Sequence, residues 1–285
     1  ELWVEALREA DDLVGRLLEE VDLATDAVLV VAPYNLPGDR DLVVSALAGP
    51  GVAPGYLRSA STQRSGFLTL VDIAPTVLDR LGIDRPLGME GRPAEVVPSG
   101  ASLDERVERL VSLNAASRFR ERLLVPTTTA AVLLLVLTLG AAVVLHVRGR
   151  DRRWRPWLRF GALTTIALLP MSYVARAFPL EDLGAGFYWG FLLATAVTLA
   201  AAATALGRWR RSARLPLVVV LAAVTLVIVF DVTTGSRLSL SAAFGYSPTG
   251  NSRLYGVSNY SYGQLAAATC LLASFIAGGR PDRRG

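Results

Sequence analysis

The sequence is poor in the residues that build metal and redox sites, with one cysteine and one histidine among 285 residues. The single cysteine, Cys270, lies in an apolar run and excludes an internal disulfide and any metal site built from cysteines. His146 is the only imidazole, and Asp39, Asp41 and Asp72 are scattered without the spacing of metal ligands. The sequence therefore predicts no metal site and no cofactor.

Several familiar sequence signals are also missing. No P-loop and no dinucleotide-binding glycine fingerprint occurs. No basic and apolar export signal precedes Glu1, so we expect the chain to be part of a longer protein. The net charge of +4 does not predict nucleic-acid binding, because the arginines cluster beside hydrophobic segments, where they set membrane orientation.

Apolar residues make up 52% of the chain and concentrate after Leu123, whereas charged residues crowd the part before it. A bilayer core of about 30 Å requires about 20 apolar residues in a helix, because every backbone polar group must be paired internally there. Five segments meet or approach this length: residues 123–147, 160–178, 186–206, 215–232 and 262–278. The sequence thus predicts an all-α transmembrane bundle of about five helices over residues 123–279.

The arginines predict how the chain is oriented in the membrane. The connections at residues 148–159 and 208–214 are strongly basic, whereas the connection between the second and third spans carries Glu181 and Asp182. By the positive-inside rule, the basic connections and the tail at residues 280–285 are cytoplasmic. We therefore expect a multi-pass protein of the cell membrane with an extracytoplasmic N-terminal domain and a cytoplasmic C-terminus. Three arginines contradict the rule, because they stand on the outer side of the first span: Arg118, Arg120 and Arg122.

The part before the spans has the pattern of an α/β segment. Residues 1–21 are spaced as an amphipathic helix, and residues 27–31 form a continuous apolar run typical of a strand buried on both faces. Residues 42–48 are a second candidate strand, and a helix at residues 76–81 is expected to end at Gly82. A connecting helix at residues 101–122 leads to the first span.

Residues 59–83 contain Asp-Ile-Ala-Pro-Thr-Val-Leu at 72–78, and Gly-Met-Glu-Gly-Arg-Pro follows at 88–93. This stretch resembles the C-terminal part of alkaline phosphatase superfamily domains, which include sulfatases and cofactor-independent phosphoglycerate mutases. The resemblance covers roughly residues 1–97 and implies an incomplete alkaline phosphatase-like α/β domain over residues 1–100. With its membrane part, the chain also resembles actinobacterial and clostridial membrane proteins that carry such a domain before several spans.

The resemblance implies two divalent metals held by Asp and His, and a Thr, Ser or formylglycine nucleophile. This chain reads Ala-Pro-Tyr-Asn at 32–35 where the family has Ser-Asp-His-Gly, and Gln-Arg-Ser at 63–65 where a further His is expected. The early part of the domain, which carries the nucleophile, is missing. We therefore predict no catalytic residue here: either the site has degenerated, as in a pseudoenzyme, or its ligands lie upstream. Asp72 and Thr76 invite a catalytic interpretation, but their spacing favours a helix start.

The connection before the last predicted span is rich in tyrosine, asparagine and glycine. This mixture suits a tyrosine belt at the membrane interface, and it also suits the binding of a polar headgroup, a sugar or a phosphate. A carboxylate at the end of the fourth span is costly unless it is paired, so Asp231 is either a functional group or an ordinary interfacial aspartate, with Arg237 or Arg253 as its partner. The candidate ligand-binding residues are Asp231, Arg237, Arg253, Tyr255, Asn259 and Tyr260.

Taken together, these patterns predict an integral membrane protein of a bacterial cell envelope with a non-catalytic phosphatase-like outer domain. Its partners are expected to be membrane lipids, with an envelope lipid or glycan as the ligand. One alternative is a metal-dependent phosphoryl or headgroup transferase or hydrolase whose catalytic residues lie upstream. Another is a transporter of lipid or solute that uses the charged residues near the fourth span.

Overall fold

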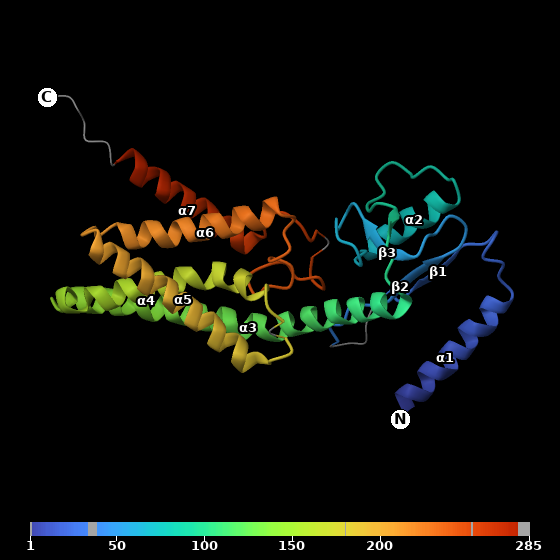
Figure 1. The fold of residues 1–285 in the computed structure, drawn as a ribbon, viewed down its shortest axis with the longest axis horizontal. Coiled ribbons are helices and arrows are strands. Elements are labelled where there is room, and N and C mark those ends of the chain that lie inside the picture. The colour runs from blue at the N-terminus through green and yellow to red at the C-terminus, as the bar shows by residue number, and fades with distance from the viewer. Residues whose placement is uncertain (1, 34–38, 180, 252, 279–285) are drawn as a thin grey trace. The chain divides into compact units, whose positions relative to one another are not determined.

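The computed structural model describes residues 2–33, 39–179, 181–251 and 253–278. The chain divides into two compact units, Glu1–Leu110 and Val111–Gly285. Figure 1 shows short strands and short helices in the first unit and long helices in the second. The division between the units falls inside the predicted connecting helix at residues 101–122.

The first unit contains two separate two-stranded antiparallel sheets among its described residues, one made of β1 and β2 and the other of β3 and β4. A 3-10 turn and helix α2 lie between β3 and β4. The elements in chain order are α1 (Leu2–Glu19), β1 (Val28–Val31), β2 (Ser45–Ala48), β3 (Gly55–Ser59), the 3-10 turn (Leu70–Asp72), α2 (Ile73–Arg80) and β4 (Ala94–Pro98).

The strand predicted at residues 27–31 is present as β1, but the prediction that it is buried on both faces is wrong. None of its residues is fully buried, and Val30 is exposed. Its partner is β2 alone, in an antiparallel pair with Val28 opposite Ala48. A run of valines predicts an extended apolar segment, but it does not specify how many strands will lie beside it. These small sheets do not show the alkaline phosphatase-like arrangement, which stays an expectation.

The helix predictions for this unit are confirmed, with shifted ends. The amphipathic helix expected at residues 1–21 is α1, and apolar side chains such as Leu7 and Leu17 are exposed on it. The helix expected from Thr76 begins earlier, at Ile73, because the 3-10 turn leads directly into it. Gly82 has a φ of +66° and follows the last turn of α2, so it stops the helix in the left-handed conformation that glycine tolerates.

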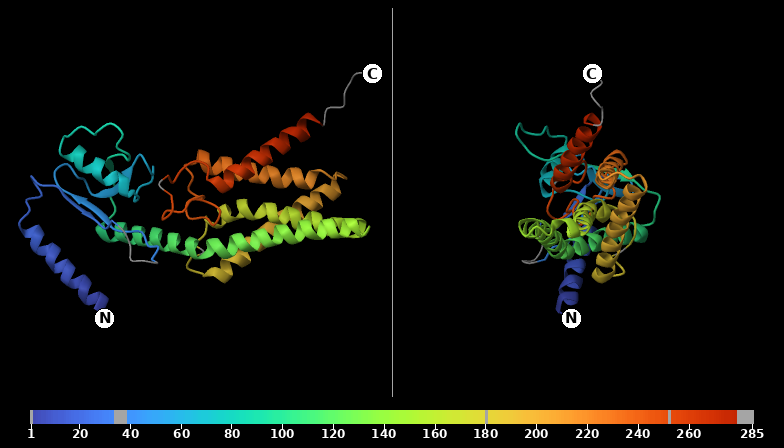
Figure 2. Two further views of the ribbon diagram at one scale, coloured as in Figure 1. Left: turned by 180° about the vertical axis from the view of Figure 1, so that it is seen from behind. Right: turned by 90° about the vertical axis from the view of Figure 1, so that its left-hand side faces the viewer.

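The second unit is built from long helices. Helix α4 packs against α5 and α6, and α6 packs against α7, as the two views of Figure 2 also show. The first of these helices, α3, begins in the first unit and continues without interruption into the second. The helices are α3 (Leu103–Val147), α4 (Asp151–Ala175), α5 (Ala185–Trp209), α6 (Leu215–Thr233) and α7 (Asn259–Ala277).

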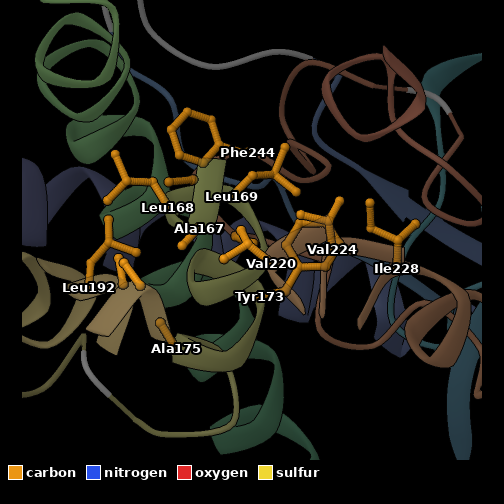
Figure 3. Close-up of a cluster of buried hydrophobic side chains, with 14 of the residues drawn as sticks. Ala167, Leu168, Leu169, Tyr173, Ala175, Leu192, Val220, Val224, Ile228 and Phe244 are labelled. Atoms are coloured by element: carbon orange, nitrogen blue, oxygen red, sulfur yellow. The ribbon is translucent and has the colours of Figure 1, made fainter. Parts of the chain in front are cut away.

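The core of the second unit combines small and bulky apolar side chains. Ala196, Ala200 and Ala203 lie along one side of α5 and are fully buried, which lets neighbouring helices approach closely. Bulky side chains of α4 and α6 fill the remaining space, among them Tyr173 and Val224. Figure 3 shows this cluster, to which Phe244 from the segment after α6 also belongs.

Within the described residues, four helices are long and apolar enough to cross a membrane: α3, α4 from Arg152 onward, α5 and α6. They contain the first, third and fourth predicted spans and most of the second, so a multi-pass membrane protein is confirmed at this level. The fifth predicted span, residues 262–278, falls on α7, which is not among the four. Polar side chains occupy the beginning of α7, up to Gln264, and leave an apolar run shorter than the roughly 20 residues that a span requires. A fifth span therefore stays a prediction.

The predicted connecting helix at residues 101–122 and the first span form one helix, not two elements. Helix α3 has 45 residues and contains Pro126 without ending there. At 1.5 Å per residue it is about 68 Å long, more than twice the roughly 30 Å of a bilayer core. Only part of α3 can therefore lie within the lipid. The predicted tail at residues 280–285 lies outside the described residues.

Candidate functional site: the polar cap of the helical unit

The segment between α6 and α7, residues 234–258, folds back onto the end of the helical unit, and we call it the cap. It lacks long helices and strands, yet many of its side chains are buried. A buried segment without regular structure must satisfy its backbone groups by specific hydrogen bonds. The buried cap residues among those described are Ser236, Ser239, Ser241, Ala242, Ala243, Phe244, Gly245, Tyr246, Ser247, Leu254 and Ser258.

Asp231, in the last turns of α6, fixes the first part of the cap. Its carboxylate is 1% exposed and accepts hydrogen bonds from two backbone amides, that of Leu238 at 2.6 Å and that of Ser239 at 3.1 Å. The sequence suggested Arg237 or Arg253 as an ion-pair partner, but both arginines are exposed. Among the described residues, the partners of this carboxylate are backbone amides of the cap. Asp231 thus shapes the cap through these backbone amides.

Arg120 of α3 fixes the centre of the cap. Its side chain is 4% exposed, and it donates from Nε to the carbonyl oxygen of Ala242 at 3.3 Å and from Nη2 to that of Gly245 at 3.5 Å. It also pairs with Glu121 at 2.6 Å, and Glu121 in turn accepts a hydrogen bond from the hydroxyl of Ser247 at 2.5 Å. The sequence analysis missed this role, because it counted Arg120 only as a charge that contradicted the positive-inside rule.

Hydroxyl groups close the cap onto the neighbouring helices. Tyr173 of α4 hydrogen-bonds to Ser261 of α7, and Ser261 hydrogen-bonds to Ser258 at 2.8 Å. Ser258 also donates to the carbonyl oxygen of Phe244 at 3.3 Å. The positions of all three hydroxyls are therefore set by one another, so the cap has a defined conformation where it meets α7.

A second set of hydrogen bonds ties the two arms of the cap together. Tyr246 donates its hydroxyl to the carbonyl oxygen of Tyr255 at 2.7 Å. Ser236 accepts from the backbone amide of Gly256 at 2.9 Å and donates to its carbonyl oxygen at 3.3 Å. Gly245 approaches Ser239 so closely that a side chain at this position would collide with the Ser239 carbonyl oxygen, so this crossing requires glycine.

The remaining predicted ligand-binding residues lie on the outer surface of the cap and at the start of α7. The guanidinium carbon of Arg253 lies 5.4 Å from the centre of the Tyr255 ring, which is a cation–π contact. Tyr260 is exposed and packs edge-on against Phe244 at 6.5 Å between ring centres. Asn259 and Arg237 are exposed as well. The structure thus brings Arg253 and Tyr255 together at the surface of the cap, whereas the carboxylate of Asp231 is buried.

A small crevice opens where the cap meets the middle of α3, the end of α4 and the start of α5. Arg176, at the end of α4, pairs there with Glu181 at 3.0 Å. Tyr188 of α5 is 4% exposed and contributes its ring and hydroxyl. The room inside is about that of one water molecule. The lining residues are Phe119, Arg120, Leu123, Ala175, Arg176, Glu181, Tyr188, Ser241 and Ala243.

In the first unit, Asp72 is the centre of a buried hydrogen-bond network. Its carboxylate accepts from the hydroxyls of Ser59, Ser61 and Thr69, each at 2.7 Å, and from the backbone amides of Thr69 and Arg92, both at 2.9 Å. Burial alone raises the pKa of this carboxyl, but the hydrogen bonds from Ser61, Thr69 and Arg92 outweigh it and hold the pKa below its ordinary value.

Thr76 connects this network to β4. Its hydroxyl donates to the carbonyl oxygen of Asp72 at 2.6 Å and accepts from the backbone amide of Ala94 at 2.9 Å. Asp72 and Thr76 are both buried and are both occupied by partners within the chain. Their positions therefore favour a structural role for this motif over a catalytic one.

Within the ranges that the structure describes, no group of three or more His, Cys, Asp or Glu side chains is placed to hold a metal ion. No family model matches the chain, and no curated protein and no solved structure is significantly similar to it.

Proposed function

We propose that this protein is a membrane-embedded binding module whose cap holds the anionic headgroup of an envelope lipid, while the first unit is a non-catalytic, phosphatase-like outer domain. The observation that carries the proposal is the Arg253–Tyr255 pair. A fixed cation stacked on an aromatic ring lies on the exposed surface of a cap that is otherwise held internally by hydrogen bonds.

Pre-organisation supports this role. The Tyr255 carbonyl is held by Tyr246, and the next residue, Gly256, is held by Ser236. Binding then costs little ordering of the backbone, because the surface is already fixed before the ligand arrives. Arg253 can present its guanidinium to a phosphate or carboxylate in the forked geometry that arginine favours.

The location of the cap also supports a lipid ligand over a soluble one. The cap follows α6 directly, and α6 is among the four helices that can span a membrane. Tyrosine and arginine side chains at the end of a spanning helix lie at the depth of the lipid headgroups. By the positive-inside rule, the arginine-rich connections at residues 148–159 and 208–214 favour a position of this end of the unit outside the cytoplasm.

The first unit supports a non-catalytic role for the outer domain. Asp72 and Thr76 are the polar residues of the segment that resembles the alkaline phosphatase superfamily, and their side chains bond to the chain itself. Residues 33 and 34, where the family pattern would place its Asp and His ligands, are proline and tyrosine.

Native mass spectrometry of the full chain in detergent tests the proposal. We expect phosphatidylglycerol to be retained more strongly than phosphatidylcholine or maltoheptaose. Arg253→Gln and Tyr255→Ala should each weaken phosphatidylglycerol retention by about three- to tenfold, the equivalent of losing a cation–π contact or a charge-assisted hydrogen bond. Arg208→Gln, which replaces an exposed arginine near the end of α5, is the matched control and should change nothing.

Three results would overturn all or part of the proposal. Equal retention of phosphatidylglycerol by the wild type and both cap variants would show that the Arg253–Tyr255 pair does not bind headgroups. Preferential retention of maltoheptaose would assign the cap to a glycan instead. Metal-dependent hydrolysis of an aryl phosphate or aryl sulfate by the same preparation would refute the non-catalytic role of the outer domain.

A further inference from the structure

Two buried hydrogen-bond donors in the crevice beneath the cap have no acceptor among the described residues. They are the hydroxyl of Tyr188 and the Nε of Arg176. The backbone of Ala243 is close to the Tyr188 hydroxyl, but the two do not form a hydrogen bond of normal geometry. Buried donors are nearly always satisfied, so an acceptor from outside the chain is expected at this place.

The other arginine of the crevice is already committed. Arg120 donates hydrogen bonds to the carbonyl oxygens of Ala242 and Gly245 and to the carboxylate of Glu121, and these contacts hold the cap. Arg176, in contrast, is paired through Nη1 with Glu181, and both side chains are only partly buried, at 21% and 17% exposure. The crevice thus offers one arginine whose partner can move aside.

The two donors prefer the same kind of acceptor, a negatively charged oxygen. A guanidinium Nε–H and a phenol O–H both donate, and an oxyanion accepts from both in charge-assisted bonds. Apolar side chains such as Phe119 and Leu123 form most of the rest of the crevice. Any acyl chain of the ligand lies outside it, because the room inside is about that of one water molecule. Glu181 provides, within the chain, the kind of carboxylate oxygen that such a ligand would bring.

We propose that this crevice is a subsite for a phosphate-type oxyanion, with one oxygen accepting from Tyr188 and Arg176 and with Glu181 as the internal competitor for Arg176. The remainder of the anion lies at the mouth of the crevice, because the interior holds only about one oxygen atom. The subsite extends the proposed headgroup binding from the surface of the cap to its buried edge, and it depends on residues other than Arg253 and Tyr255.

The test compares three variants of the full chain in detergent, with phosphatidylglycerol and inorganic phosphate as separate probes. Arg176→Gln should weaken binding about tenfold, and Tyr188→Phe about three- to tenfold, because each removes one donor to the anion. Glu181→Gln should strengthen binding several-fold, because the competing carboxylate loses its charge. Arg208→Gln again serves as the control.

The two probes identify the source of the oxyanion. Competition by inorganic phosphate would assign the subsite to the free anion as well, whereas binding of phosphatidylglycerol without such competition would assign it to the lipid. A monoglucosyl diacylglycerol, which has acyl chains but no phosphate, should bind weakly and equally to all variants.

The proposal fails if no variant changes the affinity for either probe, which would mean that the crevice holds only a water molecule. It also fails if Glu181→Gln weakens binding, because a competitor cannot act in that direction. Since a destabilised protein does not gain affinity, the Glu181→Gln result is informative even if Arg176→Gln impairs folding. If binding were lost only in the Arg253 and Tyr255 variants, the headgroup would be assigned to the cap surface and this subsite would be rejected.

Discussion

Arg120 and Ala242 are separated by 122 positions in the chain, yet the guanidinium Nε of Arg120 donates to the carbonyl oxygen of Ala242 at 3.3 Å. This contact joins α3 to the middle of the cap. Through it, one side chain satisfies backbone groups of a buried segment that has no regular structure of its own.

Replacing Arg120 should therefore destabilise the cap more than the loss of a surface charge would. In Arg120→Gln, the carbonyl oxygens of Ala242 and Gly245 lose their donor, and Glu121 loses its ion pair with Arg120. We expect a loss of roughly 2–4 kcal/mol, measured as a lower thermal unfolding temperature in detergent. Arg208→Gln should unfold like the wild type, and an equal effect of both substitutions would contradict the assigned role.

Asp231 should behave as a structural residue. Asp231→Ala leaves the amides of Leu238 and Ser239 without acceptors, at a cost of about 1–3 kcal/mol for each buried donor. Asp231→Asn keeps one side-chain oxygen and should cost less. Hydrogen exchange of the peptides that cover residues 234–245 measures the effect. If Asp231→Ala left exchange unchanged but abolished lipid or solute flux, the transporter alternative would gain support.

The Asp72 network predicts a pH dependence of the first unit. The pKa of Asp72 lies below its ordinary value in the folded chain, so the ionised form stabilises the fold. This contribution is fully present above the pKa of an unfolded aspartate, about 3.9. It is lost as the pH falls through the lower folded-state pKa.

Hydrogen exchange of peptides covering residues 59–92, corrected for the intrinsic effect of pH, should show protection that falls below about pH 4. Asp72→Asn removes the titrating group, so the fall should disappear while protection at neutral pH drops by roughly 1–3 kcal/mol. A wild type and variant with the same acid profile would show that other carboxyls control the transition.

The orientation of the helical unit is open to direct test, because Cys270 is the only cysteine. In a Cys270→Ser background, Arg153→Cys reports on the basic connection after α3, and Ser65→Cys reports on the first unit. Both positions are exposed. We expect an impermeant maleimide to label Ser65→Cys in intact cells and to label Arg153→Cys only after lysis. The reverse pattern would overturn the predicted topology.

The amount that the sequence predicts differs between the parts of the chain. The apolar stretches of α3, α5 and α6 are long enough to span a bilayer. Within lipid, a helix pairs every backbone N–H and C=O inside its own segment, so composition alone predicts these helices. α7 is harder, because its first turns are polar and its apolar run falls short of a span. β1 shows the same limit on a smaller scale, since its valines predict a strand but not its neighbours.

The candidate site was predicted by its residue types and not by its contacts. Arg253 and Tyr255 were selected from a tyrosine-rich connection, and the structure does bring them together. The sequence predicts Asp231 to be a costly charge that needs a partner, but its partners in the structure are backbone amides, and no side-chain pattern encodes those. Arg120, Arg176 and Tyr188 were missed because their partners lie far away in the sequence, where helical spacing gives no information.

The reach of Arg120 across the sequence also sets an order of events during synthesis. Its partner Ala242 is made 122 residues later, a delay of roughly 6–25 s at the usual pace of translation. Until then Arg120 lacks the two cap carbonyl oxygens to which it donates in the folded chain. During insertion, α3 therefore carries Arg120 before the cap that buries it has been made. The contact between α3 and the cap can form only after the last third of the chain has been synthesised.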